Sequence, residues 1–283
     1  MRSARVINLF TFVTRTLHLP KSSTLLTALG RAGYAAKGTV YVVMGLVAAQ
    51  AIIGKRQQST DAEGAMRMIG NGPIGVVALV LIAVGLFGYM AWRLVAAVTD
   101  AENKGDKPTA LVVRAGQAGR GLLYGALGVH AVQLLRNQAG SDGSSAQDWS
   151  ARLLQLPLGP WLVGAAAAGV FGYALYQMYR AASEERVRKH LNLRSASPNQ
   201  RTWIVRLGRF GTGARAVVFT IIAWLLFRAA LESDASEAGG IEESLRVLSG
   251  TEYGPWVLGA IGLGLASYGV YQLATARYRE MRA

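Results

Sequence analysis

Two long apolar runs without a charged side chain limit the possible folds of this chain more than any other feature. Residues 153–179 and 253–276 contain no Asp, Glu, Lys or Arg. Each run exceeds the roughly 20 residues that an α-helix needs to cross a hydrocarbon core of about 30 Å. The whole chain is 52% hydrophobic and 16% charged, which is unusual for a soluble domain. We therefore predict an all-α polytopic membrane protein.

A motif that occurs three times sets the plan of the chain. Each copy has an Arg, a Gly two residues later, a basic residue six residues later and an aromatic residue ten residues later; the copies are 31–41, 114–124 and 209–219. Each copy opens one apolar segment, and a second apolar segment follows it. We therefore predict six transmembrane helices, at 33–54, 73–98, 116–136, 157–180, 210–231 and 255–277.

Repeats with an even number of spans share one orientation and are related by an axis along the membrane normal. We therefore expect three tandem hairpins in a pseudo-threefold arrangement. The predicted segments are an N-terminal cytoplasmic or interfacial segment at 1–28, hairpin repeats at 29–100, 112–182 and 207–280, and a polybasic cytoplasmic linker at 183–206. Apolar residues recur at helical spacing within 6–17, which fits an interfacial amphipathic helix or a disordered leader.

Basic residues are distributed unequally between the two ends of the hairpins. Of the 30 Lys and Arg residues, 23 lie on the side of the terminal segments and the loops between hairpins, counting the span ends next to them, and seven lie on the side of the hairpin tips. Loops rich in Lys and Arg stay in the cytoplasm, so we expect both termini there and the tips outside. Each tip also has a short amphipathic stretch, at 61–69, 146–156 and 241–248. We interpret these as re-entry helices that join two spans, with a docking or lid role as the alternative.

A basic residue lies about one turn inside the first span of each hairpin, where a charge is costly without a partner. In a hairpin, the start of the first helix is level with the end of the second. Each basic residue is therefore expected near a Tyr and a polar residue of its own hairpin. The expected groups are Lys37 with Tyr89 and Arg93, Arg120 with Tyr173 and Gln177, and Arg215 with Tyr268 and Gln272.

These groups have three interpretations. The basic side chains can snorkel to the headgroups, stabilised by cation–π contacts or Tyr hydrogen bonds worth about 0.5–2 kcal/mol each. They can instead form three equivalent pockets for an anionic lipid headgroup on the cytoplasmic side. A solute pathway lined by the same residues is the third interpretation, and the sequence leaves all three open.

Glycines at equivalent positions of the hairpins point to close helix packing. Small residues let two helix backbones approach each other within a membrane. The glycines that we predict to lie at helix contacts are Gly85, Gly88, Gly121, Gly125, Gly169 and Gly172.

Several classes of site lack the residues that they need. The chain has no Cys, and His130 is the single His within a predicted span, so we expect no haem, zinc or other metal site. The two uncharged runs carry no Asp or Glu for a proton relay or a carboxylate pair. The basic residues flank apolar spans instead of lining one soluble face, which argues against nucleic acid as a partner. We expect no catalytic residue, no cofactor and no enzymatic activity.

Two segments carry a resemblance to a known family. GRAGYAAKGTVYVVMGLVAA at 30–49, GLFGYMAWR at 85–93 and the threefold recurrence of both resemble the bacterial membrane family catalogued as domain of unknown function 1206. The resemblance covers 29–280; the third copy departs from it with Ala216 for the motif Gly and Phe219 for Tyr. It implies repeated pairs of transmembrane helices in a bacterial cytoplasmic membrane, and it implies no activity.

Together these features predict a non-enzymatic membrane scaffold or accessory subunit that binds anionic lipid at the inner leaflet. The expected partners are membrane lipids, anionic ones preferred, with a membrane-protein partner or a larger complex left open. The alternative is a small transporter or channel along the pseudo-threefold axis. That alternative needs polar residues facing the axis, and the spans offer few of them: Gln50, His130, Gln133, Thr220 and the Gln177 and Gln272 pair.

Overall fold

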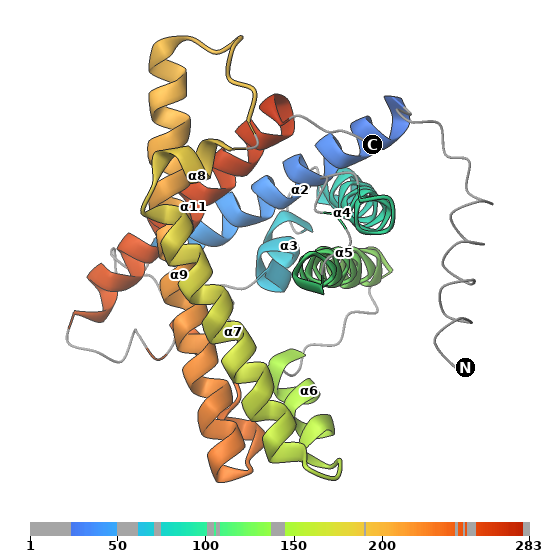
Figure 1. The fold of residues 1–283 in the computed structure, drawn as a ribbon, viewed down its shortest axis with the longest axis vertical. Helices are drawn as coiled ribbons and strands as arrows, with labels where there is room; N and C mark the ends of the chain where they lie inside the picture. The colour runs from blue at the N-terminus through green and yellow to red at the C-terminus, as the bar shows by residue number, and fades with distance from the viewer. Residues whose placement is uncertain are drawn as a thin grey trace.

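The computed structural model describes residues 24–49, 62–70, 75–100, 105, 108–136, 145–189, 191–240, 243–245, 247 and 253–279. Within these residues the fold is helical (Figure 1). Six long helices correspond to the six predicted spans: α2 (Thr24–Ala49), α4 (Gly75–Val98), α5 (Pro108–Leu135), α7 (Gly159–Ala181), α9 (Pro198–Glu232) and α11 (Gly254–Tyr278). The predicted interfacial helix within 6–17 lies outside the described residues, and of the predicted N-terminal segment 1–28 the structure describes only residues 24–28, at the start of α2.

Four helical segments are long and apolar enough to cross a membrane: Gly30–Ala49, Gly75–Val98, Pro198–Glu232 and Gly254–Tyr278. The chain is therefore a multi-pass membrane protein. The remaining two long helices, α5 and α7, do not reach the same apolarity. Arg114, Gln117 and Arg120 lie in the first half of α5, and α7 takes much of its length from Gly and Ala, which add little apolar surface.

Short helices join the long ones at the hairpin tips, as expected for the first two hairpins. They are α3 (Ala62–Gly70) and α6 (Ser145–Leu154). Ala65 and Met66 of α3 are almost fully buried, because α3 packs against α2, α4 and α5. In the third hairpin, the 3₁₀-helix η2 (Ala235–Glu237) packs against α6 and α9.

The start of α9 differs from the sequence prediction. The predicted span begins at 210, whereas α9 begins at Pro198, so the expected linker 183–206 is partly helical. A capping box explains this start: the Ser197 hydroxyl accepts from the Gln200 amide at 3.3 Å, and the Gln200 side chain accepts from the Ser197 amide at 3.0 Å. The rest of the linker contains α8 (Glu184–Arg188), and the Tyr271 hydroxyl donates to the Val187 carbonyl at 2.9 Å.

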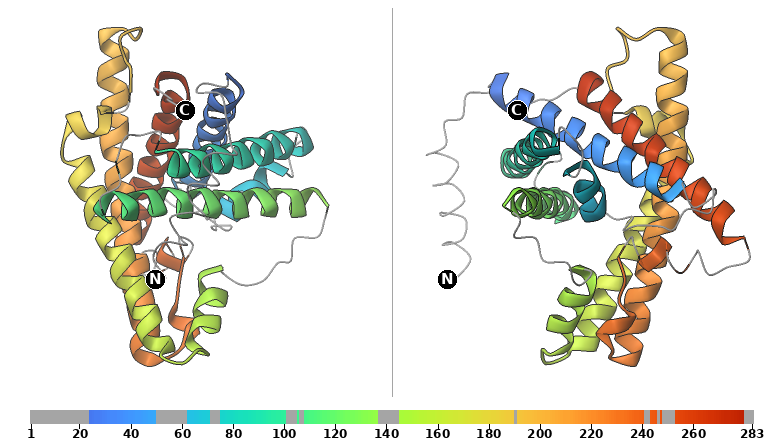
Figure 2. Two further views of the ribbon diagram at one scale, coloured as in Figure 1. Left: turned by 45° about the vertical axis from the view of Figure 1, so that its right-hand side comes forward. Right: turned by 180° about the vertical axis from the view of Figure 1, so that it is seen from behind.

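The long helices pack as three pairs: α4 with α5, α7 with α9, and α11 with α2 (Figures 1 and 2). Each pair joins the second helix of one repeat to the first helix of the next, with α11 closing the cycle on α2. The pairs point in different directions, since α4 and α5 are seen nearly end-on in Figure 1 while α7 and α9 lie in its plane.

The first Arg of the repeated motif fixes two of these pairs. The Arg114 guanidinium on α5 donates to the carbonyls of Ala97 and Val98, at 2.7 and 2.8 Å, at the end of α4. Arg209 on α9 donates in the same way to Ala181 at the end of α7, at 3.0 Å. A basic side chain thus satisfies carbonyl groups that the helix C-terminus leaves without an intrahelical partner.

Contacts within the repeats are less regular than the pairs between repeats. In the first repeat α2 packs against α4, and in the third α9 packs against α11. In the second repeat α5 and α7 make no extensive contact with each other. The predicted pseudo-threefold arrangement is therefore not confirmed: the pairing between repeats recurs three times, but the contact within a repeat recurs only twice.

The most extensive helix contact in the described part of the chain is formed by α2 and α11. Two glycines of α2 face two glycines of α11, Gly38 against Gly269 and Gly45 against Gly262. A Cβ on Gly38 would lie 2.8 Å from the Gly269 carbonyl oxygen, and a Cβ on Gly262 would lie 2.7 Å from the Gly45 carbonyl oxygen. Small residues in this pattern let two antiparallel helix backbones touch. The contact joins the first helix of the first repeat to the second helix of the third repeat.

Candidate functional site

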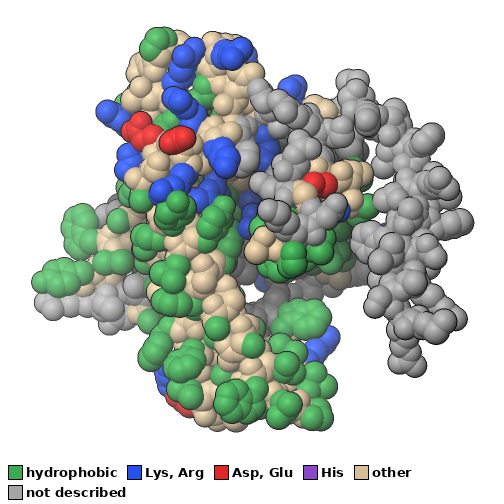
Figure 3. All heavy atoms as spheres, in the orientation of Figure 1, with side chains coloured by type: hydrophobic (Ala, Val, Ile, Leu, Met, Phe, Trp, Pro, Cys, Tyr) green, Lys and Arg blue, Asp and Glu red, His purple; other side chains and the backbone are tan. Residues whose placement is uncertain are grey.

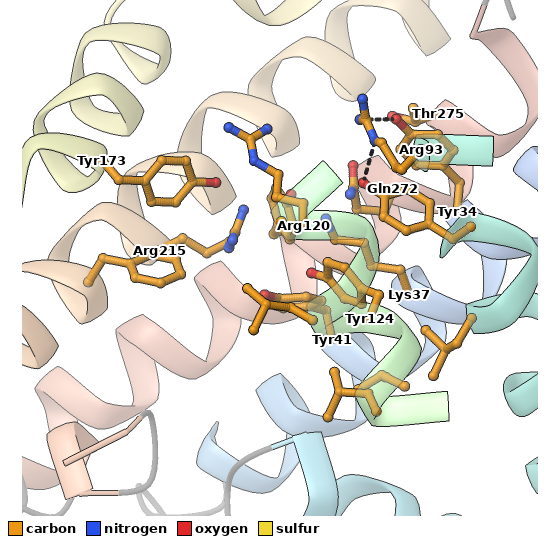
Figure 4. Close-up of a pocket in the computed structure, with 18 of the residues that line it drawn as sticks. Tyr34, Lys37, Tyr41, Arg93, Arg120, Tyr124, Tyr173, Arg215, Gln272 and Thr275 are labelled. Atoms are coloured by element: carbon orange, nitrogen blue, oxygen red, sulfur yellow. Dashed lines mark hydrogen bonds between the residues drawn. The ribbon is translucent and has the colours of Figure 1, made fainter. Parts of the chain in front are cut away.

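A cavity of about 580 Å³ lies where the three helix pairs meet (Figure 4). Its lining includes residues of all six long helices, so it depends on the whole fold and on no single hairpin. Along α2 the lining changes from Lys37 to Val40 and Met44, and along α5 it changes from Arg120 to Leu127. The cavity is therefore basic and aromatic towards one end and apolar towards the other. The apolar end is lined by residues of one hydrophobic cluster: Val40, Met44, Met66, Leu86 and Leu127.

Six basic side chains line this cavity, one from each long helix or its immediate end. They are Lys37 of α2, Arg93 of α4, Arg120 of α5, Arg180 of α7, Arg215 of α9 and Arg279 after α11. Among the described residues that line the cavity there is no Asp or Glu. Like charges repel when water is excluded from the space between them, so this basic cluster favours an anion.

Lys37 occupies a cage of tyrosine rings. Its side chain is 6% exposed, and its ammonium lies 4.6 Å from the ring centre of Tyr124 and 5.6 Å from those of Tyr89 and Tyr268. Across the described part of the chain, no hydrogen bond or ion pair to this ammonium is found. The aromatic faces stabilise the cation without neutralising it.

Arg215 is in a similar position on α9. It is 5% exposed, and its guanidinium lies 4.3 Å from the ring centre of Tyr268 and 5.2 Å from those of Tyr41 and Phe219. Its Nε has no hydrogen-bond partner among the described residues. A buried guanidinium nitrogen without an acceptor is unfavourable, which again points to an acceptor supplied by a ligand.

Arg93 is held more firmly than the other basic residues. Its guanidinium donates to the Tyr89 hydroxyl at 3.0 Å and to the Tyr34 hydroxyl at 2.8 Å. Arg279 stacks nearby, 5.2 Å from the ring centre of Tyr34 and 5.3 Å from that of Trp92. These contacts fix one wall of the basic cluster.

Arg120 and Arg180 form the side of the cluster next to α7. Arg120 is half-buried, and its guanidinium lies 5.2 Å from the ring centre of Tyr173. Arg180 donates to the Gln177 side-chain oxygen at 3.5 Å. For Arg120, the described residues show no hydrogen bond or ion pair, so its charge is available to the cavity.

The three expected cation–tyrosine pairs are all present: Lys37 with Tyr89, Arg120 with Tyr173, and Arg215 with Tyr268. They do not form three separate pockets, because all six residues line the same cavity. Figure 4 shows Lys37, Arg120 and Arg215 pointing into one region of it. Of the remaining expected site residues, Arg93 and Gln272 also line it. Gln177 is buried and is not among the described lining residues, but it accepts a hydrogen bond from Arg180, which lines the cavity.

Sequence reasoning missed several lining residues, of which the main ones are Tyr34, Tyr41, Tyr124, Arg180 and Arg279. A signal for two of them was present, since Tyr41 and Tyr124 are the aromatic position that closes the repeated motif. Arg180 and Arg279 lie at the ends of spans, where basic residues are common and carry no specific signal.

The expected packing glycines fall into two groups. Gly85 meets α2, where its Cβ would lie 2.7 Å from the Ala36 Cβ, and Gly121 and Gly125 meet Arg93 and Met90 of α4. Gly88 is buried within α4. The other two, Gly169 and Gly172 on α7, would place a Cβ within 4 Å of no atom, because α5 does not pack against this face.

Metal ligands do not gather in the described part of the chain, where no group of three His, Cys, Asp or Glu residues could hold an ion. His130 is half-buried on α5 and is not among the described residues that line the cavity. The site is thus defined by basic, tyrosine and apolar side chains.

Comparison with known proteins gives the same division into repeats. The model of the family described as Domain of Unknown Function (DUF1206) matches residues 32–100, 115–184 and 210–279. The chain is also similar to the "Uncharacterized protein YxxB" of Bacillus subtilis (strain 168), with 29% identity over 252 residues, which are 89% of this chain and 90% of that protein. No solved structure matches the chain significantly. Since the three family matches cover most of the chain and coincide with the hairpins that build the cavity, the protein belongs to the Domain of Unknown Function (DUF1206) family.

Proposed function

We propose that this membrane protein binds an anionic lipid, with the phosphate of its headgroup in the basic cluster. The observation that carries the proposal is the burial of Lys37 and Arg215, both more than nine-tenths inaccessible, in a cavity whose described lining has no carboxylate. A buried charge without a counterion is costly. A phosphate group would accept hydrogen bonds from both side chains and from Arg120.

The shape of the cavity supports an amphiphile more than a small soluble anion. The basic cluster continues into the apolar end lined by Met44, Met66, Leu86 and Leu127. A free phosphate would leave this apolar space without a partner. A lipid matches both ends, since its headgroup is charged and its hydrocarbon is not.

The outer surface supports a location within a bilayer. Side chains of α4 that face outward are apolar and exposed, namely Val76, Val77, Val80, Leu81 and Val84. On α7, exposed Trp161 and exposed Tyr179 are 18 residues apart, which is about 27 Å at 1.5 Å per residue. Aromatic residues at this separation fit the two interfaces of a membrane, which supports a span for α7 as well.

The distribution of basic side chains supports a cytoplasmic position for both termini. Lys and Arg gather over α8 and the first half of α9, whereas hydrophobic side chains cover α7 below them (Figure 3). By the positive-inside rule, this basic end lies on the cytoplasmic side of the membrane, which we propose to be a bacterial cytoplasmic membrane. The basic cluster would then lie at the level of the inner leaflet.

We propose a binding role and not a catalytic one, because the described lining offers neither a carboxylate nor a histidine as a general base. A scaffold or accessory subunit that requires anionic lipid is the cellular role consistent with this proposal. The transporter or channel alternative stays a prediction, with no specific observation in its favour.

The test compares lipid retention by two double variants in native mass spectrometry of protein purified with its own lipids. Lys37→Gln with Arg215→Gln is expected to lower bound phosphatidylglycerol or cardiolipin at least tenfold, because each charge-assisted hydrogen bond contributes about 1.5–3 kcal/mol. The control, Arg188→Gln with Arg206→Gln, removes the same charge from two exposed positions near the same end and is expected to change retention less than twofold.

Folding is checked by thermal unfolding in lipid-free detergent. The Lys37 and Arg215 double variant is expected to be at least as stable as the parent protein, since it removes two buried charges. Unchanged lipid retention in a folded double variant would overturn the proposal. Equal losses in both double variants would mean attraction of lipid to the basic surface and not to the cavity.

A further inference from the structure

The second hairpin differs from the other two at equivalent glycines. In the first hairpin, a Cβ on Gly33 would collide with Tyr89, and a Cβ on Gly85 would lie 2.7 Å from that of Ala36. In the third hairpin, a Cβ on Gly211 would meet the backbone of Tyr268. In both hairpins the glycines therefore allow the two helices to touch.

In the second hairpin the equivalent glycines face open space. A Cβ placed on Gly116, Gly119 or Gly169 would meet no atom within 4 Å. All three glycines line the cavity, two on α5 and one on α7. We call the space between them the glycine opening. At these positions α5 and α7 do not fill the cavity by packing against each other.

We propose that the glycine opening holds a hydrocarbon chain of the anionic lipid whose phosphate lies in the basic cluster. This inference rests on the proposed function and adds the position of the lipid chain to it. The headgroup side is close by, since Arg120 on α5 and Tyr173 on α7 lie across the opening from each other, 5.2 Å from guanidinium to ring centre. Arg215, with its buried and unpartnered Nε, lines the same cavity.

The rim of the opening has the chemistry of a lipid chain site. Leu123 and Leu127 of α5 and Ala166 and Val170 of α7 line the cavity beside the glycines. Leu123 is 69% exposed, although it lies beside a polar cluster. A chain in the opening would cover this apolar surface, and the missing side chains of the glycines provide its width.

A pair of leucine substitutions tests the position of the chain. Gly169→Leu fills the opening, whereas Gly172→Leu, one turn further along α7, is equally free of neighbouring atoms but is not part of the described cavity lining. Protein stripped of lipid is titrated with dioleoyl-phosphatidylglycerol in detergent and, separately, with glycerol 3-phosphate, which carries the same phosphate without chains.

Gly169→Leu is expected to weaken binding of dioleoyl-phosphatidylglycerol at least fivefold and to leave glycerol 3-phosphate binding within twofold of the parent protein. Gly172→Leu is expected to change neither by more than twofold. Lipid binding by Gly169→Leu equal to that of the parent would overturn the inference while leaving the headgroup site intact. If Lys37→Gln with Arg215→Gln binds both probes as the parent does, the proposed function itself fails.

A disulfide test separates an occupied opening from a hairpin that closes on itself. The chain has no Cys, so Gly119→Cys with Gly169→Cys gives the single possible pair. The equivalent positions in the first hairpin, Ala36 and Gly85, are in direct contact. In membranes with native lipid we expect little oxidation to a disulfide and more after the lipid is removed. Complete cross-linking in native membranes would show that α5 and α7 meet and that no chain lies between them.

Discussion

Replacement of Gly45 by leucine is expected to destabilise the folded protein by more than about 3 kcal/mol and to remove most of it from detergent extracts. A Cβ at Gly45 would collide with the backbone of Gly262 and Ala266 on α11. Extra methylenes in a packed core usually cost about 1–3 kcal/mol, and here the obstacle is backbone that cannot change rotamer. The pair of α2 and α11 would have to separate.

The measurement is the thermal midpoint of the detergent-solubilised protein, followed by size-exclusion fluorescence. Gly172→Leu is the matched control, because it adds the same side chain where no atom lies within 4 Å. We expect its midpoint to stay within a few degrees of that of the parent, in line with about 0.5 kcal/mol for a surface change. Similar midpoints for the two variants would mean that α2 and α11 do not pack through their glycines.

The positions of the helices were predictable because the signal is repeated and long. Long apolar runs and a motif that recurs three times both indicate transmembrane helices, and each predicted span overlaps a long helix. The ends were less predictable. α9 starts twelve residues before the predicted span because Ser197 and Gln200 form a capping box. These residues lie in a polar stretch, so a search for apolar runs does not detect this helix start.

The site was predictable within each hairpin but not between hairpins. The start of one helix is level with the end of the next, and this alone placed Lys37 near Tyr89 and Arg215 near Tyr268. The convergence of all these groups on one cavity depends on which helices of different repeats pair. Sequence periodicity describes a face of one helix and contains no information on its partner.

The glycines show the same limit. Gly85 and Gly169 occupy equivalent positions in the repeats, and the sequence gives no reason to treat them differently. Gly85 lies against α2, while Gly169 borders the glycine opening. A glycine in a span allows a close approach to its backbone, and the sequence alone does not show whether another helix or a ligand makes that approach.

Labelling of single cysteines is expected to give an all-or-none result for membrane orientation. The chain has no Cys, so the unmodified protein gives no signal. Ser236→Cys lies at the exposed third tip and Ser195→Cys in the exposed linker before α9. In intact spheroplasts, a membrane-impermeant maleimide is expected to label the first and to spare the second, because the end rich in Lys and Arg stays in the cytoplasm.

Permeabilisation of the spheroplasts provides the control, since both cysteines should then react to the same extent. Labelling of Ser195→Cys in intact spheroplasts would place the linker, and with it the basic end of the molecule, outside the cell. The basic cluster would then face the outer leaflet, and lipids of that leaflet would be its ligands. The expected orientation instead puts Lys37, Arg120 and Arg215 at the depth of inner-leaflet phosphates, where a headgroup can reach them without crossing the hydrocarbon core.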